Sequence, residues 1–160
     1  MKVLVLYYSK GGNTRRLAEA IAAGVDEVSG AEAVLKKTDQ VSKEDFLEAD
    51  AVIAGSPVYF GTMAAQLKQV FDEFVSVRKK MENKIGAAFT TAGDVTGGKE
   101  TTLFSILQAL MIYGMAIVGD PMAATGHYGV SCVGKPEEKN LVHGRLLGNR
   151  VAKFSLKLSE

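Results

Sequence analysis

The chain alternates short apolar runs with amphipathic stretches along its whole length, and this alternation constrains the fold more than any other feature. The runs with the length and apolar character of buried strands cover residues 3–8, 31–37, 51–55, 85–89 and 115–118. Short continuous apolar runs are typical of strands that are covered on both faces. We therefore expect a sheet that lies in the interior of the molecule.

Apolar residues recur at helical spacing after each of these runs. In the last such stretch, for example, Leu147, Val151 and Phe154 share one face of a helix. The five expected helices span residues 14–28, 44–47, 64–80, 102–113 and 136–158. Alternating strands and helices predict an α/β fold, a three-layer sandwich with a five-stranded parallel sheet between two helical layers. The candidate strand order is 2-1-3-4-5, and residues 1–160 are expected to form a single domain.

Composition excludes several classes of function. Lys and Arg total 19 and Asp and Glu total 18, a net charge of +1 that offers no basic field for nucleic acid. The one cysteine, Cys132, allows no internal disulfide, and no cluster of metal ligands is apparent. No apolar run approaches the roughly 18 residues that cross a bilayer, and no signal-peptide pattern is present. We expect a cytoplasmic protein without a metal, a nucleic-acid partner or a membrane partner.

A sheet of this strand order binds its ligand beyond the carboxyl ends of strands one and three. The first loop at this edge, residues 9–14, reads Ser-Lys-Gly-Gly-Asn-Thr and leads directly into a helix. Its glycines let backbone N–H groups approach a ligand, and the helix start adds free donors. These features predict an anion cradle, although the motif is neither a Walker A loop nor G-x-G-x-x-G. The alternative is an ordinary turn in which Thr14 is the N-cap.

The second and third loops add different chemistry. Residues 56–63 carry adjacent aromatic side chains, Tyr59 and Phe60, that can stack on a planar ring, fold back on the core or meet another subunit. Residues 90–100 are rich in small and hydroxyl side chains, which suit either the edge of a heterocycle or a mobile surface loop. Together the three loops suit a mononucleotide with a large flat ring.

Residues 9–14 resemble the [ST]-x-x-G-[NH]-[TI] signature for FMN phosphate in the flavodoxin-like superfamily. Within that superfamily the chain is most similar to the WrbA-type NAD(P)H:quinone oxidoreductases and their short flavodoxin-like relatives. The similarity lies in residues 56–63, Gln66, Phe71-Asp72, residues 97–102 and residues 113–118. It covers nearly the whole chain, and it implies a flavodoxin-like fold with FMN as cofactor and NAD(P)H as electron donor.

The resemblance also implies which residues form the site. The implied cofactor-binding residues are Ser9, Lys10, Gly11, Gly12, Asn13, Thr14, Pro57, Val58, Tyr59, Phe60, Gly61, Thr91, Ala92, Gly93, Asp94 and Gly97. No side chain is expected to be catalytic, because the flavin carries the redox chemistry. Tyr113, which stands where the family has a histidine, and His127 are candidate substrate contacts. The segment 119–135 also holds Cys132, which we interpret as a small buried apolar residue.

These observations leave three functions open. The first is an oxidoreductase that passes electrons from NAD(P)H through FMN to a quinone or similar small acceptor. The second is a flavodoxin-type carrier between redox proteins, and the third is a protein that binds FMN without turnover. The near-zero charge favours the enzyme, because carrier flavodoxins resemble one another in being acidic. The absence of an aromatic residue from residues 90–100 also favours it.

The chain is shorter than WrbA-type proteins, and it is expected to lack their insertion around the fifth strand. The resemblance further implies a homo-oligomer, either a dimer or a tetramer.

Overall fold

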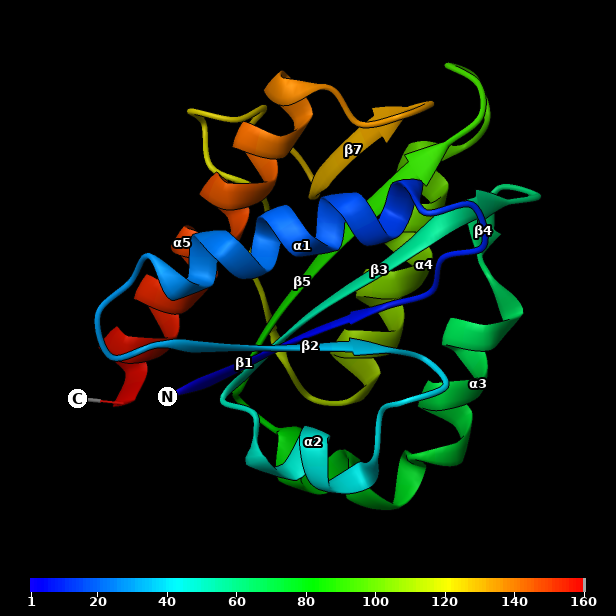
Figure 1. Ribbon diagram of the computed structural model, residues 1–160. Coiled ribbons are helices and arrows are strands. Elements are labelled where there is room, and N and C mark those ends of the chain that lie inside the picture. The colour runs from blue at the N-terminus through cyan, green and yellow to red at the C-terminus, as the bar shows by residue number, and fades with distance from the viewer. Residues whose placement is uncertain (160) are drawn as a thin grey trace.

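The computed structural model describes residues 1–159 and shows a parallel sheet between two layers of helices (Figure 1). The main path of the sheet has the order β2-β1-β3-β5-β6, and neighbours along it are parallel. Its strands are β1 (Lys2–Tyr7), β2 (Glu32–Lys37), β3 (Ala51–Tyr59), β5 (Ile85–Ala92) and β6 (Ala116–Ile117). The predicted fold class and the predicted 2-1-3-4-5 order are confirmed.

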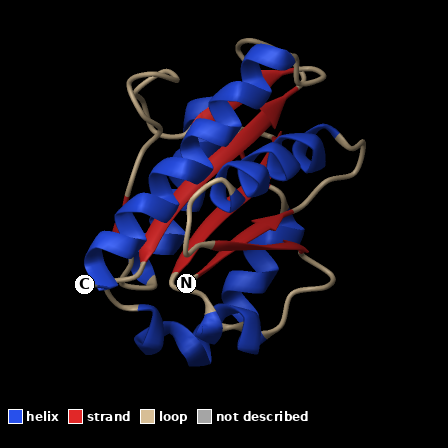
Figure 2. Cartoon of the chain, turned by 60° about the vertical axis from the view of Figure 1, so that its left-hand side comes forward, coloured by secondary structure: helices blue, strands red, loops and turns tan. Residues whose placement is uncertain are grey.

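The helices cover both faces of this sheet, as Figure 2 shows. One face carries α1 (Asn13–Asp26) and α5 (Glu138–Ser159). The other carries α2 (Lys43–Glu48), α3 (Ala65–Glu73), the 3-10 helix η1 (Val75–Met81) and α4 (Lys99–Ile112). No helix within residues 1–159 has the length and apolar character to cross a membrane.

One predicted helix, residues 64–80, is divided. The α-helical part ends at Glu73, and the chain continues as the tighter η1 from Val75. The β-branched Val75 and Val77 fit a regular α-helix less well than unbranched residues do. Phe74, at the junction, packs its ring edge-on against Phe46 with the ring centroids 5.5 Å apart.

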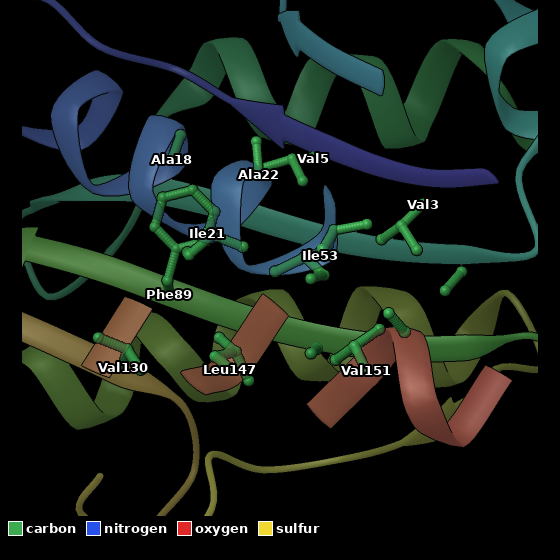
Figure 3. Packing of buried hydrophobic residues seen from close by; sticks show 14 of the residues in the cluster. Val3, Val5, Ala18, Ile21, Ala22, Ile53, Phe89, Val130, Leu147 and Val151 are labelled. Atoms are coloured by element: carbon green, nitrogen blue, oxygen red, sulfur yellow. The ribbon is translucent and has the colours of Figure 1, made fainter. Parts of the chain in front are cut away.

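Alternating side chains of β1 divide the core into two parts. Val3 and Val5 point toward α1 and α5, whereas Leu4 and Leu6 point toward the α2–α4 side. Figure 3 shows the first part, in which Phe89 of β5 lies among residues of α1 and α5. Burial on both sides explains why β1 reads as a continuous apolar run in the sequence.

The fifth strand of the sheet is interrupted, which the sequence did not predict. β6 pairs with the start of β5, and β7 (Val130–Val133) pairs with its end. Between them residues 118–129 leave the sheet as an excursion. The buried Asp120 closes it, because its carboxylate accepts hydrogen bonds from Thr125, Gly126 and His127. With the short β4 (Thr62–Met63), this division gives seven strands within residues 1–159 instead of the expected five.

Candidate functional site

Three loops meet at the carboxyl edge of the sheet, after β1, β3 and β5. The first and third are joined by a buried hydrogen bond of 2.8 Å between the hydroxyl oxygens of Thr14 and Thr91. The second and third touch through their backbones, because a Cβ added at Gly98 would lie only 2.9 Å from the Cα of Gly61. The structure therefore brings together the segments that the sequence singled out.

The first loop leaves backbone donors free at the start of α1. Gly12 is the N-cap with a φ of 92°, and no side chain caps this helix. Its N–H donates to Ser9 Oγ, 3.1 Å away, and the first helical bond runs from Arg16 N–H to Gly12 C=O. Among the described residues, the N–H groups of residues 13–15 have no acceptor, so they join the positive end of the helix dipole as an anion site. The alternative with Thr14 as N-cap is wrong, because its hydroxyl bonds to Thr91.

Positive side chains surround a polar cavity of about 390 Å³ beside this loop. Lys10, Arg15 and Lys37 line it. Arg15 pairs with Glu19 and Lys37 with Asp39, each at 2.7 Å, and these carboxylates raise the pKa of both cations. We did not predict Arg15 or Lys37. Lys37 could have been found, because β2 is parallel to β1 and ends at the same edge of the sheet.

The second loop is a tight β-hairpin and not an open loop. Tyr59 of β3 pairs with Thr62 of β4, and only two residues connect the strands. These residues, Phe60 and Gly61, have φ values of 51° and 76°, as a type I′ turn requires. Ser56 anchors the base of the hairpin, because its Oγ accepts from the N–H of Ala64 at 2.8 Å.

The two aromatic residues of this hairpin lie in different environments. Tyr59 meets Tyr8 edge-on with the ring centroids 6.2 Å apart, and burial together with Tyr8 raises its pKa. Phe60 is fully exposed at the tip and does not fold back on the core. Holding a non-glycine residue at positive φ costs about 1–2 kcal/mol. Tyr8, which we did not predict, could have been found as the last aromatic residue before the first loop.

The third loop is shaped by the side chain of Asp94. Its Oδ1 accepts from the N–H and the hydroxyl of Thr96 at 2.9 and 2.8 Å, and these bonds lower the pKa of Asp94. The loop ends at Gly98, the N-cap of α4 with a φ of 101°. Gly98 was not among the predicted residues, although the Gly97-Gly98 pair directly before a helix was a usable signal.

A groove of about 680 Å³ extends from the hairpin over α3 and α4. Its apolar lining includes Phe60, Met63, Ala109 and Ile112, and Lys68 and Gln108 add polar groups. No sequence pattern indicates this groove, because it depends on how the hairpin packs against the two helices.

The structure argues against Tyr113 as a substrate contact. It ends α4 just before β6, which pairs with the start of β5, and this is the amino edge of the sheet. Its hydroxyl donates to Phe71 C=O at 2.6 Å, and burial raises its pKa to about 12. The hydroxyl therefore forms a hydrogen bond within the core and does not face a substrate.

His127 lies in the excursion, where its backbone N–H donates to Asp120. Its exposed ring lies near Tyr128, which packs on Phe104 of α4 with the ring centroids 4.5 Å apart. A substrate role for His127 stays a prediction. Cys132 of β7 is buried, as expected, and burial raises its pKa to about 11, which keeps the thiol protonated at neutral pH.

The chain is similar in sequence and in structure to known proteins, which include NAD(P)H dehydrogenases (quinone) and flavodoxins. The family described as NADPH-dependent FMN reductase matches residues 32–129. An NAD(P)H dehydrogenase (quinone) from Archaeoglobus fulgidus is 35% identical over 98% of both chains. A flavodoxin from Aquifex aeolicus is 37% identical over 96% of this chain and 86% of its own. The solved structure of a flavodoxin, WrbA-like protein from Agrobacterium tumefaciens has a TM-score of 0.85 at 27% identity, over 98% of both chains.

Proposed function

The chain belongs to the NADPH-dependent FMN reductase family, and from this membership we propose that it is an FMN-dependent NAD(P)H:quinone oxidoreductase of the WrbA type. In this proposal NAD(P)H is the electron donor, and a quinone or similar small molecule is the acceptor. The single observation of the structure that supports its cofactor site is the set of free N–H groups at the start of α1, at the switch point of a parallel sheet.

The first loop fits the phosphate of FMN. A phosphate only accepts hydrogen bonds, and residues 13–15 present N–H groups that lack an acceptor within the described chain. A Cβ added at Gly11 or Gly12 would project into open space, so no part of the described protein fills the region beside the helix start. Ser9 and residues 10–14 would hold the phosphate, with Lys10, Arg15 and Lys37 balancing its charge.

The other two loops fit the flavin ring. Residues 57–61 would line the ring, with Tyr59 and Phe60 as the aromatic surface. Thr91, Ala92, Gly93, Asp94 and Gly97 would face its other edge, and Gly98 lets the second and third loops meet closely. Because residues 90–100 contain no aromatic side chain, one face of the ring stays open to a nicotinamide or a quinone.

When bound, the flavin supplies the hydride and electron transfer between donor and acceptor. The chain's own residues bind the phosphate, orient the ring and leave access to one face. In this proposal no side chain at this edge has to act as a nucleophile or general base.

A turnover assay tests this function directly. Purified protein with added FMN should oxidise NADH or NADPH continuously when benzoquinone is present, and the rate should depend on FMN. Failure to bind FMN would contradict the whole proposal. FMN binding without NAD(P)H oxidation would contradict the enzyme and leave the cofactor site in place.

The carrier is the second candidate, because the flavodoxin from Aquifex aeolicus aligns over 161 positions, close to this chain's 160 residues. The alignment with the Archaeoglobus dehydrogenase extends over 189 positions and so needs gaps. The +1 charge favours the enzyme over an acidic shuttle. A carrier would accept electrons from a reductase protein and pass them to a redox protein, without oxidising NAD(P)H alone.

We further propose a single domain that works in the cytoplasm as a homo-oligomer, a dimer or a tetramer. The exposed Phe60, Val75, Met111 and Ile112, on the hairpin and near α3 and α4, support an interface on that side. Light scattering on a sizing column measures the mass, and a monomeric mass would contradict the oligomer.

A further inference from the structure

A further cavity, of about 380 Å³, lies away from the three loops. It is formed by α5 and the excursion of residues 118–129, and none of its lining residues belongs to the loops of the proposed flavin site. In Figure 1 the red α5 and the yellow excursion lie on the left of the molecule, opposite the β4 hairpin. A ligand here would therefore not be the flavin or its substrate.

The floor of this cavity is apolar. Pro121 and Ala123 come from the excursion, and Leu146, Phe154 and Leu156 come from α5. The helix turns its other face toward α1, where Leu147 and Val151 are fully buried. Leu156 also packs against that core, so Leu146 and the exposed Phe154 are the apolar residues of α5 at this cavity that the core leaves uncovered.

The rim of the cavity is positive. Arg150, Lys153 and Lys157 line it, and none of them has a carboxylate partner among residues 1–159. Arg145, one to three turns away on the same helix, pairs with Glu138. α5 therefore pairs Arg145 with a carboxylate of its own, whereas the three cations around the apolar cavity have no such partner in the described chain.

Arg150 carries the strongest sign of a missing partner. Its Nε is buried and has no hydrogen-bond acceptor within the described chain. Its guanidinium lies 5.2 Å from the centre of the Phe154 ring, which holds it against the apolar floor. Buried donors in folded proteins are nearly always paired, so this Nε is an unusual cost to the protein. Because the Nε itself is enclosed, a ligand in the cavity would pair with the rest of the Arg150 guanidinium, for which no ion pair is present among residues 1–159.

We propose that this cavity binds a small anionic amphiphile: a molecule with one carboxylate head and an apolar body, such as a medium-chain fatty acid. The head would pair with the fork of Arg150, with Lys153 and Lys157 beside it, and the body would lie over the apolar floor. The volume falls within the range of about 300–1,000 Å³ that is common for small-ligand sites.

Two other occupants fit less well. A second copy of the chain, related by a two-fold axis through this hollow, would place three cations opposite three cations. A flat membrane surface would contact projecting side chains, whereas the apolar residues here line a concavity.

Calorimetric titration of the purified protein with decanoate tests the proposal. We expect saturable binding at one site per chain. Arg150→Gln should weaken it about tenfold or more, because a charge-assisted pair is lost. Arg145→Gln, a matched change on the same helix outside the cavity, should leave the affinity unchanged.

Further variants separate binding from folding. Ala123→Trp should fill the hollow, and the double change Lys153→Gln with Lys157→Gln should weaken binding although both side chains are on the surface. Decanol, which has the same chain without the charge, should bind at least about tenfold more weakly. Equal binding of decanol and decanoate, or no loss in any cavity variant, would overturn the proposal. So would vesicles of phosphatidylglycerol that bind the protein through Arg150 when decanoate does not.

Discussion

Polar groups are paired at the amino end of the sheet, whereas several at the carboxyl end have no partner among residues 1–159. At the amino end, Lys84 donates to the carbonyl oxygens of Phe46, Leu47 and Ala49, and Tyr113 donates to Phe71. At the carboxyl end, the N–H groups of residues 13–15 find no acceptor within the described chain, and Phe60 stands fully exposed in a strained conformation. Both ends belong to the same strands, so the difference lies in the loops.

This contrast separates stability from function. Unpaired donors and a strained aromatic residue lower stability, and they persist only where the surrounding structure holds them. Here the buried Thr14–Thr91 bond and the Gly61–Gly98 contact hold the carboxyl loops. Changes at the carboxyl end should therefore affect binding first, and changes at the amino end should affect folding alone.

The largest expected effect comes from a substitution at Gly12, before α1. Gly30, beyond the other end of α1, provides the control. Gly12 and Gly30 have similar positive φ values of 92° and 85°. Gly12→Leu should weaken FMN binding by about 100-fold or more, since it blocks at least two N–H bonds to a charged group. Quenching of FMN fluorescence on titration measures this.

Gly30→Leu is the matched control. It places the same side chain at a similar backbone angle, so both variants should lose about 1–2 kcal/mol of unfolding free energy. FMN affinity should fall in Gly12→Leu only. Equal losses of FMN affinity in both variants would contradict the proposed difference between the carboxyl and amino ends of the sheet.

Tyr113→Phe removes a hydrogen bond at the amino end of the sheet. Removing the hydroxyl leaves the buried Phe71 carbonyl without its donor, which should cost about 1–3 kcal/mol in urea unfolding. FMN affinity and quinone turnover should not change. A large rise in the KM for quinone with normal stability would restore Tyr113 as a substrate contact.

Asp120→Asn tests the excursion, where a buried carboxylate accepts from three successive residues. Burial raises the pKa of Asp120, but those bonds together outweigh it and leave the pKa below its ordinary value near 3.8. The carboxylate's contribution to stability is therefore present above that value and is lost as the pH falls through the lower folded value. The variant should be less stable by about 1–2 kcal/mol at neutral pH. Unfolding curves across the acid range should show the gap to the parent protein closing; a constant gap would contradict this role.

Thr91→Val should have the smallest effect, because it removes one neutral bond between the first and third loops. We expect a loss of about 1 kcal/mol in stability and a several-fold loss of FMN affinity. Thr91→Ser keeps the hydroxyl and should restore both. Unchanged affinity in the valine variant, which keeps the methyl group, or an equal loss in the serine variant would contradict this role of the bond.

The sequence predicted those parts of the molecule that depend on local pattern. The parallel sheet between helices follows from buried runs alternating with helices, and the order 2-1-3-4-5 was the candidate for five such strands. The meeting of three loops follows from parallel strands ending at one edge. Gly12 and Asn13 could be singled out because a loop between a buried strand and a helix has few alternatives.

The features that were missed depend on contacts between distant residues. Thr14 reads as an N-cap until Thr91 is known to lie beside it, 77 positions along the chain. Tyr113 was expected to be a site residue because it stands where the family has a histidine. Its hydroxyl instead donates to the Phe71 carbonyl, a contact that the sequence does not show. The divided fifth strand was hidden because Asp120 closes the excursion mainly through the backbone N–H groups of Thr125, Gly126 and His127, which leave no trace in the side-chain pattern. The Thr125 hydroxyl is the one side-chain donor among these bonds.

The central claim is that the carboxyl edge alone holds the cofactor. Amide correlation NMR spectra of the protein, recorded while FMN is added, test it most directly. The amide signals of residues 9–14, 58–61 and 91–98 should shift together and saturate, while those of Gly30, Lys84 and Tyr113 should stay in place. Shifts centred on the amino edge or on α5, with the three loops unchanged, would contradict it.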